Sequence, residues 1–178
     1  MTAGKRRRLL IVDGYNAIRS GSRYKNITLP DYTDDYFNVA RERLLNDVIN
    51  YAGKRMEAVI VYDAAYRTGA PSEMQTIGGV RIIFSSPGQT ADRVIEKLAH
   101  DARERNVETI VVTSDATIQD TVFGEGVDRM SAEGFCAELA RMDDFQAESE
   151  SNRSKPKSTV AARIPKETLD ALIALRDR

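Results

Sequence analysis

Four aspartates stand where chemistry is commonly done in a sheet of parallel strands. Asp13, Asp63 and Asp115 come at or just after the end of a short apolar run, and such runs indicate strands buried on both faces. Asp92 stands in the first turn of a predicted helix that follows another such run. Since ligands bind at the carboxyl ends of parallel strands, these four carboxylates could form one site if they share an edge of the sheet.

Carboxylates that gather at one edge repel one another and raise each other's pKa unless a cation neutralises them. Oxygen ligands of this kind suit one or two ions of Mg²⁺ or Mn²⁺. Magnesium held by a few carboxylates keeps several waters and takes further ligands from a phosphate. One of those waters can attack the phosphorus while the metal stabilises the charge. Asn16, three residues after Asp13, can orient a carboxylate or a water.

Each aspartate also has a purely structural explanation. A carboxylate after a strand can cap the next helix, and acidic residues are common in first helical turns because a helix N-terminus favours negative charge. The residues alone therefore leave two interpretations open, a metal-dependent phosphate chemistry and a set of helix caps.

Five strands and four helices are expected to position these aspartates. Apolar runs predict strands at residues 8–12, 58–62, 80–84, 109–112 and 127–130. Apolar residues at helical spacing predict helices at residues 37–52, 91–102, 116–123 and 135–142, the last capped by Ser131. The segments between these elements are predicted to include two long loops, at residues 17–36 and 64–78.

The order of these elements implies a parallel α/β sheet with helices on both faces. Right-handed connections between parallel strands bring the strand ends, and with them Asp13, Asp63 and Asp115, to one rim. Thr90 is the expected N-cap of the helix that follows the third strand. That helix then begins at the same rim and carries Asp92 to it.

Composition limits the classes of protein. The 178 residues carry a net charge of −1, with 42% hydrophobic and 30% charged residues, as in an ordinary soluble domain. No apolar run approaches the ~20 residues of a membrane span, and the run after Lys5-Arg6-Arg7-Arg8 is too short for a secretory signal, so a cytoplasmic protein is expected. The single cysteine, Cys136, excludes an internal disulfide and is interpreted as a core residue. The single histidine, His100, excludes a multi-histidine metal site and is interpreted as a surface residue.

The composition changes after Met142. An acidic, serine-containing stretch is followed by a basic one, and apolar residues recur at helical spacing near the C-terminus. The predicted organisation is a domain at residues 1–145, a mobile charged linker at 146–162 and an amphipathic C-terminal helix at 163–178.

Other phosphate chemistries of α/β proteins fit poorly. The chain has no Gly-rich loop ending in Lys-Ser/Thr and no G-x-G-x-x-G after the first strand. A phospho-aspartate phosphatase needs a second Asp two residues after the first, and Tyr15 stands there instead. A receiver domain needs a Lys near the last strand end, and none is in place.

Five short motifs, in order and in register, point to a known family. They are Asp13-Gly14-Tyr15-Asn16, Val61-Tyr62-Asp63-Ala64, Thr90-Ala91-Asp92, Thr113-Ser114-Asp115 and Val122-Phe123-Gly124. From residue 9 to about 142 the chain resembles the YacP-like NYN-domain proteins, which are bacterial members of the PIN-like nuclease superfamily. Residues 169–176 also resemble the terminal helix of that family.

The resemblance implies a three-layer PIN-like (Rossmannoid) fold with a central, mostly parallel sheet and a small C-terminal helical tail. It also implies a metal-dependent endoribonuclease that uses Mg²⁺ or Mn²⁺ and meets its substrate, mRNA, in the context of translation and the ribosome. Asp13, Asp92 and Asp115 match the family's metal-binding acids. Asn16 completes the first motif, and Asp63 matches a recurrent acid.

One position departs from the family pattern. Arg93 follows Asp92 where relatives often carry a second acid. The arginine could remove a metal contact or add a phosphate contact. Glu96, one turn further on, could compensate for a lost carboxylate.

An RNA substrate requires a local basic surface, because the whole chain is not a polycation. The candidate phosphate contacts, which lie in or near the predicted rim loops, are Arg19, Arg23, Lys25, Arg67 and Arg93. Aromatic side chains of the first loop either stack on bases or pack the loop onto the body, and they are Tyr15, Tyr24, Tyr32 and Tyr36.

Two other functions stay open. One is a non-catalytic RNA- or ribosome-binding module with the same fold, and the other is an α/β domain whose acids are caps and whose terminal helix binds a protein. The four aspartates favour the enzyme, whereas Arg93 favours the binding module. A monomer is expected in each case.

Overall fold

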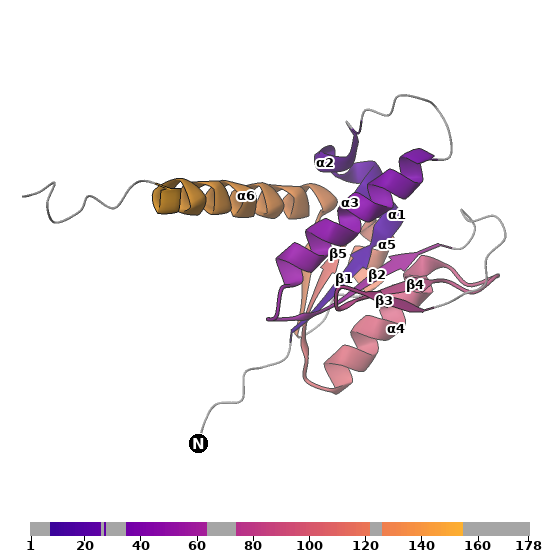
Figure 1. Ribbon diagram of the computed structural model, residues 1–178. Coiled ribbons are helices and arrows are strands. Elements are labelled where there is room, and N and C mark those ends of the chain that lie inside the picture. The colour runs from indigo at the N-terminus through magenta and orange to yellow at the C-terminus, as the bar shows by residue number, and fades with distance from the viewer. Residues whose placement is uncertain (1–7, 26, 28–34, 64–73, 122–125, 155–178) are drawn as a thin grey trace, which may run out of the picture. The chain divides into compact units, whose positions relative to one another are not determined.

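The computed structural model describes residues 8–25, 27, 35–63, 74–121 and 126–154 (Figure 1). Its six-stranded sheet has the order β3-β4-β2-β1-β5-β6. The strands are β1 (Arg8–Asp13), β2 (Glu57–Tyr62), β3 (Gln75–Ile77), β4 (Val80–Phe84), β5 (Glu108–Val112) and β6 (Val127–Met130). The helices are α1 (Gly14–Ser20), α2 (Ser22–Lys25), α3 (Asp35–Ala52), α4 (Ala91–Glu104), α5 (Ala116–Thr121) and α6 (Ala132–Ser154). The β3–β4 pair is antiparallel and the other four pairs are parallel, which confirms a mostly parallel α/β sheet.

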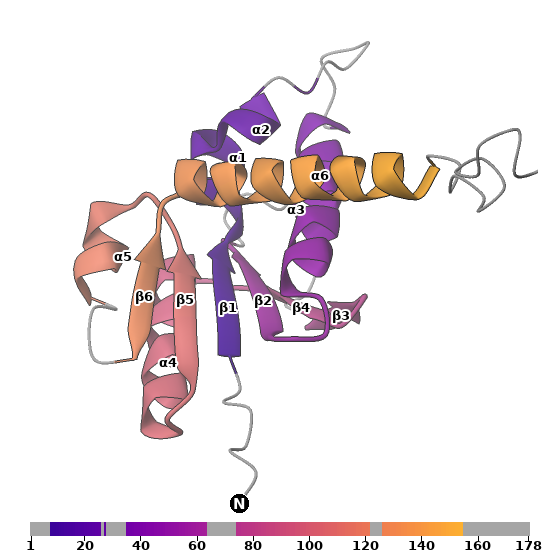
Figure 2. The ribbon, with the colours of Figure 1, turned by 90° about the vertical axis from the view of Figure 1, so that its left-hand side faces the viewer.

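The central strand β1 explains the three layers. Leu10 and Val12 belong to an apolar core that also holds residues of α1, α3 and the start of α6. Leu9 and Ile11 belong to a second core, built with α4 and α5. Successive side chains of a strand point to opposite faces, so an unbroken apolar run is required when helices cover both. Figures 1 and 2 show α3 and α4 on these opposite faces of the sheet.

The segment 17–36, predicted as a loop, begins with helical structure. Helix α1 starts directly after Asp13 and ends at Gly21, and the short α2 follows it. Ala17, Ile18 and Tyr24 are each fully buried, so these short helices are stabilised by contacts with the body of the domain. Local sequence, with its glycine and polar residues, carries no sign of that burial.

A buried carboxylate ties α2 to α3. Arg23 donates two hydrogen bonds to Asp47, at 2.8 and 2.9 Å, and the Tyr24 hydroxyl donates a third at 3.0 Å. Burial raises the pKa of Tyr24 well above its usual range, and the charge of Asp47 adds to the rise. The phenol therefore stays protonated and remains a donor to Asp47.

The segment 64–78, also predicted as a loop, ends in the edge strand β3. This strand pairs with β4 from Gln75↔Ile82 to Ile77↔Val80, and the intervening Gly78 and Gly79 both have positive φ (59° and 84°). Two glycines with positive φ are the signature of a tight hairpin turn whose twist matches its strands. The three strand residues are too few to give a recognisable apolar alternation.

The last described helix is longer than expected. Its predicted end at Met142 is wrong, because α6 continues to Ser154 and so includes the first nine residues of the proposed linker at 146–162. The chain divides into two compact units, Met1–Ala140 and Arg141–Arg178, so α6 belongs to both. The proposed C-terminal helix at 163–178 lies outside the described residues. Within the described ranges, no helix has the length and apolar character needed to cross a membrane.

Candidate active site

Asp13 is the most deeply placed of the four aspartates. It ends β1, caps α1 and is only 7% exposed. One carboxylate oxygen accepts a hydrogen bond from the backbone N–H of Asn16 at 3.3 Å, and the other accepts one from the Thr113 hydroxyl at 3.1 Å. Burial raises the pKa of Asp13 from 3.8 to about 6; the two hydrogen bonds oppose the rise, and the charges of Asp92 and Asp115 add to it.

Thr113 joins two of the aspartates. Its hydroxyl donates to Asp13 and accepts a hydrogen bond from the backbone N–H of Asp115, at 3.1 Å in each case. The residue is 1% exposed, so neither bond competes with bulk water. In the sequence, Thr113 stands in the motif Thr113-Ser114-Asp115 without a predicted role. Its place between the end of a strand and an aspartate is the signal that could have found it.

Asn16 acts on the loop after β5. Its amide oxygen accepts a hydrogen bond from the backbone N–H of Ser114 at 2.7 Å, and the Ser114 hydroxyl accepts one from the backbone N–H of Ala132 at 3.0 Å. These bonds join α1, the β5–α5 loop and the start of α6. Asn16 therefore holds the loop that carries Asp115. In this structure, Asn16 is a positioning residue for that aspartate.

Asp115 and Asp92 approach Asp13 from two other elements. Asp115 follows β5 and caps α5, since its carboxylate accepts a hydrogen bond from the backbone N–H of Thr117 at 2.8 Å. Asp92 is in the first turn of α4, whose N-cap is Thr90 as expected. Burial raises the pKa of Asp92, and the charges of Asp115, Glu96 and Asp63 raise it further.

The expected rim is therefore present in the structure. Asp13, Asp63 and Asp115 lie at or just after strand ends, and Figure 2 shows the arrowheads of β1, β5 and β6 at one edge of the sheet. We call the four residues Asp13, Asp63, Asp92 and Asp115 the rim aspartates. Two of them, Asp13 and Asp115, are also helix caps, so the structural and the chemical interpretations of these residues are compatible.

The rim aspartates form an open set. Among the described residues, one group of three potential ligands has its ligand atoms all within 4.8 Å of one another, and that group is His100, Asp101 and Glu104. Asp13, Asp92 and Asp115 interact electrostatically but do not close to that distance as a set. An open set of hard oxygen donors fits Mg²⁺ or Mn²⁺, because these ions keep several waters and take the remaining ligands from a phosphate.

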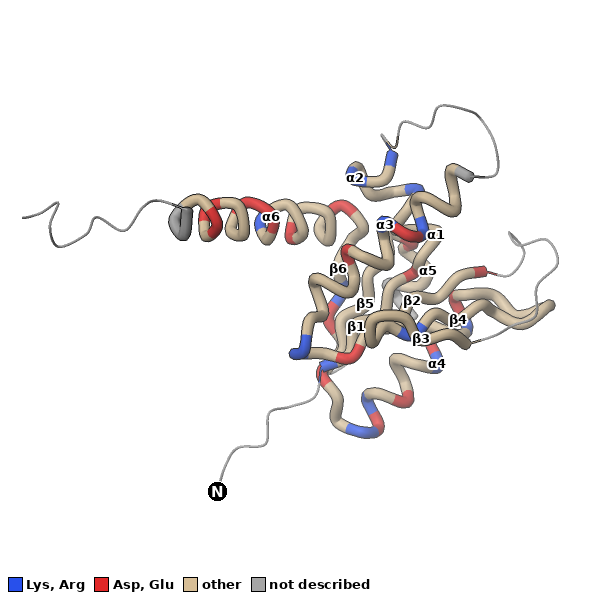
Figure 3. Tube along the Cα trace, viewed as in Figure 1, with Lys and Arg blue, Asp and Glu red and all other residues tan. Residues whose placement is uncertain are grey.

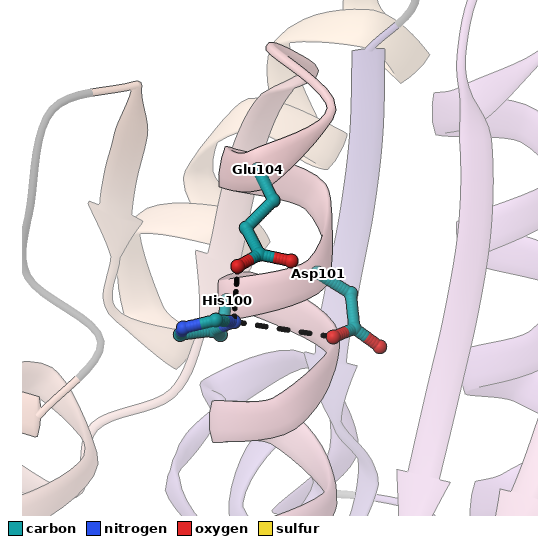
Figure 4. A group of neighbouring side chains, drawn as sticks. All are labelled: His100, Asp101 and Glu104. Carbon is teal, nitrogen blue, oxygen red and sulfur yellow. Dashed lines mark ion pairs between the residues drawn. The ribbon is translucent and has the colours of Figure 1, made fainter.

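The second acidic group lies further along α4 (Figure 4). The His100 ring nitrogen is 4.0 Å from a carboxylate oxygen of Asp101 and 4.0 Å from one of Glu104. The side chains are 61%, 42% and 70% exposed respectively. His100 is eight residues after Asp92, about 12 Å along a helix axis, so this group is separate from the rim. The interpretation of His100 as a surface residue is confirmed.

The five basic candidates for RNA contact have different surroundings. Arg19 lies with its guanidinium carbon 5.9 Å from the centre of the Tyr15 ring, and Arg23 is paired with Asp47. Lys25 and Arg93 are exposed, and Arg67 lies outside the described residues. Figure 3 shows blue segments in α1 and α2, the elements that follow the end of β1.

The tyrosines of the first predicted loop pack against the body wherever the structure describes them. Tyr15 is 5% exposed and Tyr24 is fully buried. The Tyr36 hydroxyl donates to the backbone oxygen of Tyr24 at 3.0 Å. Tyr32 lies outside the described residues. The packing interpretation therefore holds for three of the four tyrosines.

The fold and the rim aspartates define the class of protein to which this chain belongs. The sequence profile of the YacP-like NYN domain matches residues 10–177, so the chain is a member of that family and has a fold of the PIN-like nuclease type. It is 33% identical over 135 residues to the uncharacterized protein YacP of Bacillus subtilis (strain 168), covering 76% of each chain.

Two crystal structures of Rae1 (YacP) from Bacillus subtilis have the same fold. One is of a mutant, which matches with a TM-score of 0.67 and 26% identity, over 94% of this chain and 99% of the other. The second matches with a TM-score of 0.66 and 28% identity, over 95% of this chain and 94% of the other. Together with the family profile, these structures confirm the predicted PIN-like three-layer fold.

Proposed function

We propose that this protein is a metal-dependent endoribonuclease, with its active site at the rim aspartates. The observation that carries the proposal is the environment of Asp13, a carboxylate that is 7% exposed and lies in the field of Asp92 and Asp115. A buried carboxylate close to other carboxylates is unfavourable in its charged form unless a cation compensates it. Membership of a family with a nuclease-type fold supports the same chemistry.

Asp13, Asp92 and Asp115 are the residues that would hold Mg²⁺ or Mn²⁺, with Asp63 as a further candidate. With a pKa of about 6, Asp13 is ionised at neutral pH and can serve as a ligand. When bound, the ion supplies an activated water and positive charge for the phosphate oxygens. In the hydrolysis, the water oxygen bonds to phosphorus and a P–O bond of the RNA backbone breaks, leaving one hydroxyl and one phosphate end.

The chain's other residues position these carboxylates. Thr113 bonds both to the Asp13 carboxylate and to the backbone N–H of Asp115, and so fixes their separation. Asn16 holds the loop after β5 through the backbone N–H of Ser114. Arg93 is exposed in the first turn of α4 and can contact a phosphate there, while Glu96 adds negative charge near Asp92. The departure at Arg93 is compatible with an enzyme, because Glu96 acts on Asp92 from the next turn.

The substrate is proposed to be mRNA, met during translation on the ribosome in the cytoplasm, by a monomeric protein. This part of the proposal rests on the resemblance to the family. Lys25 and Arg93 are exposed, and Arg93 is next to Asp92 in the first turn of α4, so both are candidates for contacts with RNA phosphates. Arg19 is a third candidate beside Tyr15.

A second function is favoured by one observation. Arg93 stands next to Asp92 where relatives often carry a second acid, and a non-catalytic RNA- or ribosome-binding module would not need that acid. Such a module would bind RNA through the same basic residues without cleaving it. Metal binding separates the two functions.

The test is a calorimetric titration of Mn²⁺ into the full chain, combined with cleavage assays on free and on translated RNA. We expect metal binding and cleavage in the wild type, and loss of both in Asp92→Asn. Glu104→Gln is the matched control, because it neutralises a carboxylate of the same helix outside the rim. Cleavage only of translated RNA would identify a ribosome-dependent substrate. Absence of both metal binding and cleavage would leave the binding module.

A further inference from the structure

A cleft lies on the α3 side of the sheet, close to the rim. It has a volume of about 650 Å³ and is lined by α3, β2, β3 and β4. Pockets of about 300–1,000 Å³ are the size that binds small organic ligands. Its lining includes Asn38, Arg41, Tyr62, Gln75, Ile77 and Phe84. Nothing in the proposed hydrolysis uses this cleft.

Aromatic rings line the cleft from the ends of two strands. Tyr62 ends β2 and Phe84 ends β4, and the two rings are stacked, with centroids 5.3 Å apart and planes inclined by 25°. Tyr62 is 2% exposed and is held edge-on by Tyr15, at 5.0 Å. Phe84 is half-buried. Tyr62 is therefore enclosed within the stack, whereas the Phe84 ring is partly exposed.

The aromatic stack adjoins the rim aspartates. Tyr62 immediately precedes Asp63, and it packs so closely over Gly14 that a Cβ there would lie 2.2 Å from the ring. Gly14 in turn follows Asp13. Arg41, from α3, donates a hydrogen bond to the Tyr15 hydroxyl at 3.4 Å. Tyr62 therefore both lines the cleft and contacts the backbone that follows Asp13.

Polar groups complete the lining. The side-chain amides of Asn38 and Gln75 offer donors and acceptors. The Arg41 guanidinium, which donates to Asn38, and the Glu42 carboxylate bring one charge of each sign to the lining. Ile77, on the edge strand, is 45% exposed at this cleft. Aromatic faces together with amides and a guanidinium are the groups with which proteins bind unpaired bases, by stacking and by hydrogen bonds to base edges.

We propose that this cleft binds an unpaired nucleobase of the RNA strand whose backbone reaches the rim aspartates. The inference rests on the proposed function for the position of the phosphate, but the cleft itself is independent of the chemistry. The base extends the Tyr62–Phe84 stack, and Arg41 faces its phosphodiester. Cleavage is then confined to single-stranded RNA, because a base paired in a helix cannot enter the cleft.

The test uses a short single-stranded RNA carrying one 2-aminopurine, a fluorescent base that is quenched on stacking. Binding is measured with Ca²⁺ in place of Mg²⁺. We expect quenching by the wild type and weaker binding of the same RNA made abasic at that position. Phe84→Leu keeps an apolar side chain but removes the ring, and should raise Kd about tenfold and abolish quenching. The control Phe145→Leu removes an exposed ring that does not line the cleft, and should change neither.

A second pair of variants guards against misfolding of Phe84→Leu. Ile77→Glu places a carboxylate in the cleft and should weaken binding by about tenfold, whereas Met74→Glu adds the same charge at an exposed residue outside the lining. The inference is overturned if the wild type binds intact and abasic RNA with equal affinity. It is also overturned if neither Phe84→Leu nor Ile77→Glu weakens binding. The inference is also overturned if an apolar peptide binds in the cleft and RNA does not.

The failure of this inference and that of the nuclease are distinguishable. Cleavage that depends on Asp92 but not on the cleft variants would leave the nuclease standing and remove the base site. Base-dependent quenching without cleavage by the wild type would leave the base site and remove the nuclease.

Discussion

Helix α4 carries two acidic groups whose physical character is opposite. At its first turn, Asp92 joins carboxylates that come from β1, β2 and the end of β5, and burial with mutual repulsion raises the pKa of Asp92. Further along, His100, Asp101 and Glu104 are neighbours on one helix, and all three side chains are exposed to solvent (Figure 4). The repulsion within the first group opposes folding, whereas solvent screens the interactions within the second.

The difference teaches that proximity of ligand atoms alone is a poor guide to a functional site. Residues one and four apart on a helix meet without any help from the fold, and solvent screens what they do. The rim aspartates meet only because three strands end at one edge and a helix begins there. An arrangement that costs stability and needs the whole fold is the better candidate for chemistry.

The largest expected effect is the loss of activity in Asp13→Asn. Asparagine keeps an acceptor for the Asn16 N–H and a polar partner for Thr113, but it removes the negative charge that would bind the ion. Mutations of groups that only support metal ligands cost 10- to 100-fold, so removal of a ligand should lower the cleavage rate by at least about 100-fold. Rates measured at saturating Mn²⁺ test this. An active Asp13→Asn would exclude Asp13 as a ligand.

Thr113→Val should have the next largest effect. Valine has nearly the same shape but leaves a buried carboxylate oxygen of Asp13 and the N–H of Asp115 without their partner. We expect a loss of about 1–3 kcal/mol in unfolding free energy and a 10- to 100-fold fall in cleavage. Denaturant unfolding and cleavage rates measure the two effects.

Thr113→Ser is the matched control, since it keeps the hydroxyl and removes a methyl group. Recovery of most of the cleavage rate in this variant would assign the effect to the hydrogen bonds. If serine were as inactive as valine, the hydroxyl would have no positioning role.

A third prediction concerns stability and pH in the presence of a chelator. The folded pKa of Asp13, about 6, lies above its ordinary value of 3.8, so the native state binds the proton more tightly than the unfolded state does. The stability contributed by Asp13 is full below about pH 4 and is lost as pH rises through about 6, by up to about 3 kcal/mol. Asp13→Asn should therefore melt several degrees higher than the wild type at pH 7.5, but not at pH 4.

Thermal unfolding of both proteins at the two pH values measures this difference. Excess Mn²⁺ should reverse the order at pH 7.5, since only the wild type gains stability from the ion. A wild type that melts higher than Asp13→Asn in chelator at pH 7.5 would contradict the raised pKa.

The smallest effect is expected in the second acidic group. Glu104→Gln removes one partner of an exposed i, i+4 pair, and such pairs contribute less than about 0.5 kcal/mol. Its melting temperature, Mn²⁺ affinity and cleavage rate should match those of the wild type. A loss of Mn²⁺ binding in Glu104→Gln, with binding retained in Asp92→Asn, would move the metal site from the rim to this group.

Much of the fold could be predicted because its signals are local. The apolar run from Leu9 to Val12 predicts a strand covered on both faces, and Thr90 followed by apolar residues at helical spacing predicts α4. Parallel strands with right-handed connections leave one rim for the strand ends. The convergence of the rim aspartates follows from those rules, so the residue types and their order along the chain were sufficient to predict it.

Three features depended on contacts between distant parts of the chain. The helices α1 and α2 form where Tyr24 can be buried and Arg23 can reach Asp47, and β3 forms because β4 offers it an edge. These short elements have weak intrinsic preferences, so their environment decides their conformation. No local pattern of polar and apolar residues reports that environment.

The amino-acid sequence by itself determined where the aspartates stand relative to the secondary structure, since each one either follows an apolar run that predicts a buried strand or lies in the first turn of a capped helix. Only the tertiary structure decided how those residues work together. The Thr113 hydroxyl meets Asp13 across 100 positions of sequence, and the Tyr62–Phe84 stack is created by the pairing of two strands. The physical reason is that secondary structure follows the periodicity of neighbouring residues, whereas hydrogen bonds and cavities depend on which surfaces the packed elements bring together.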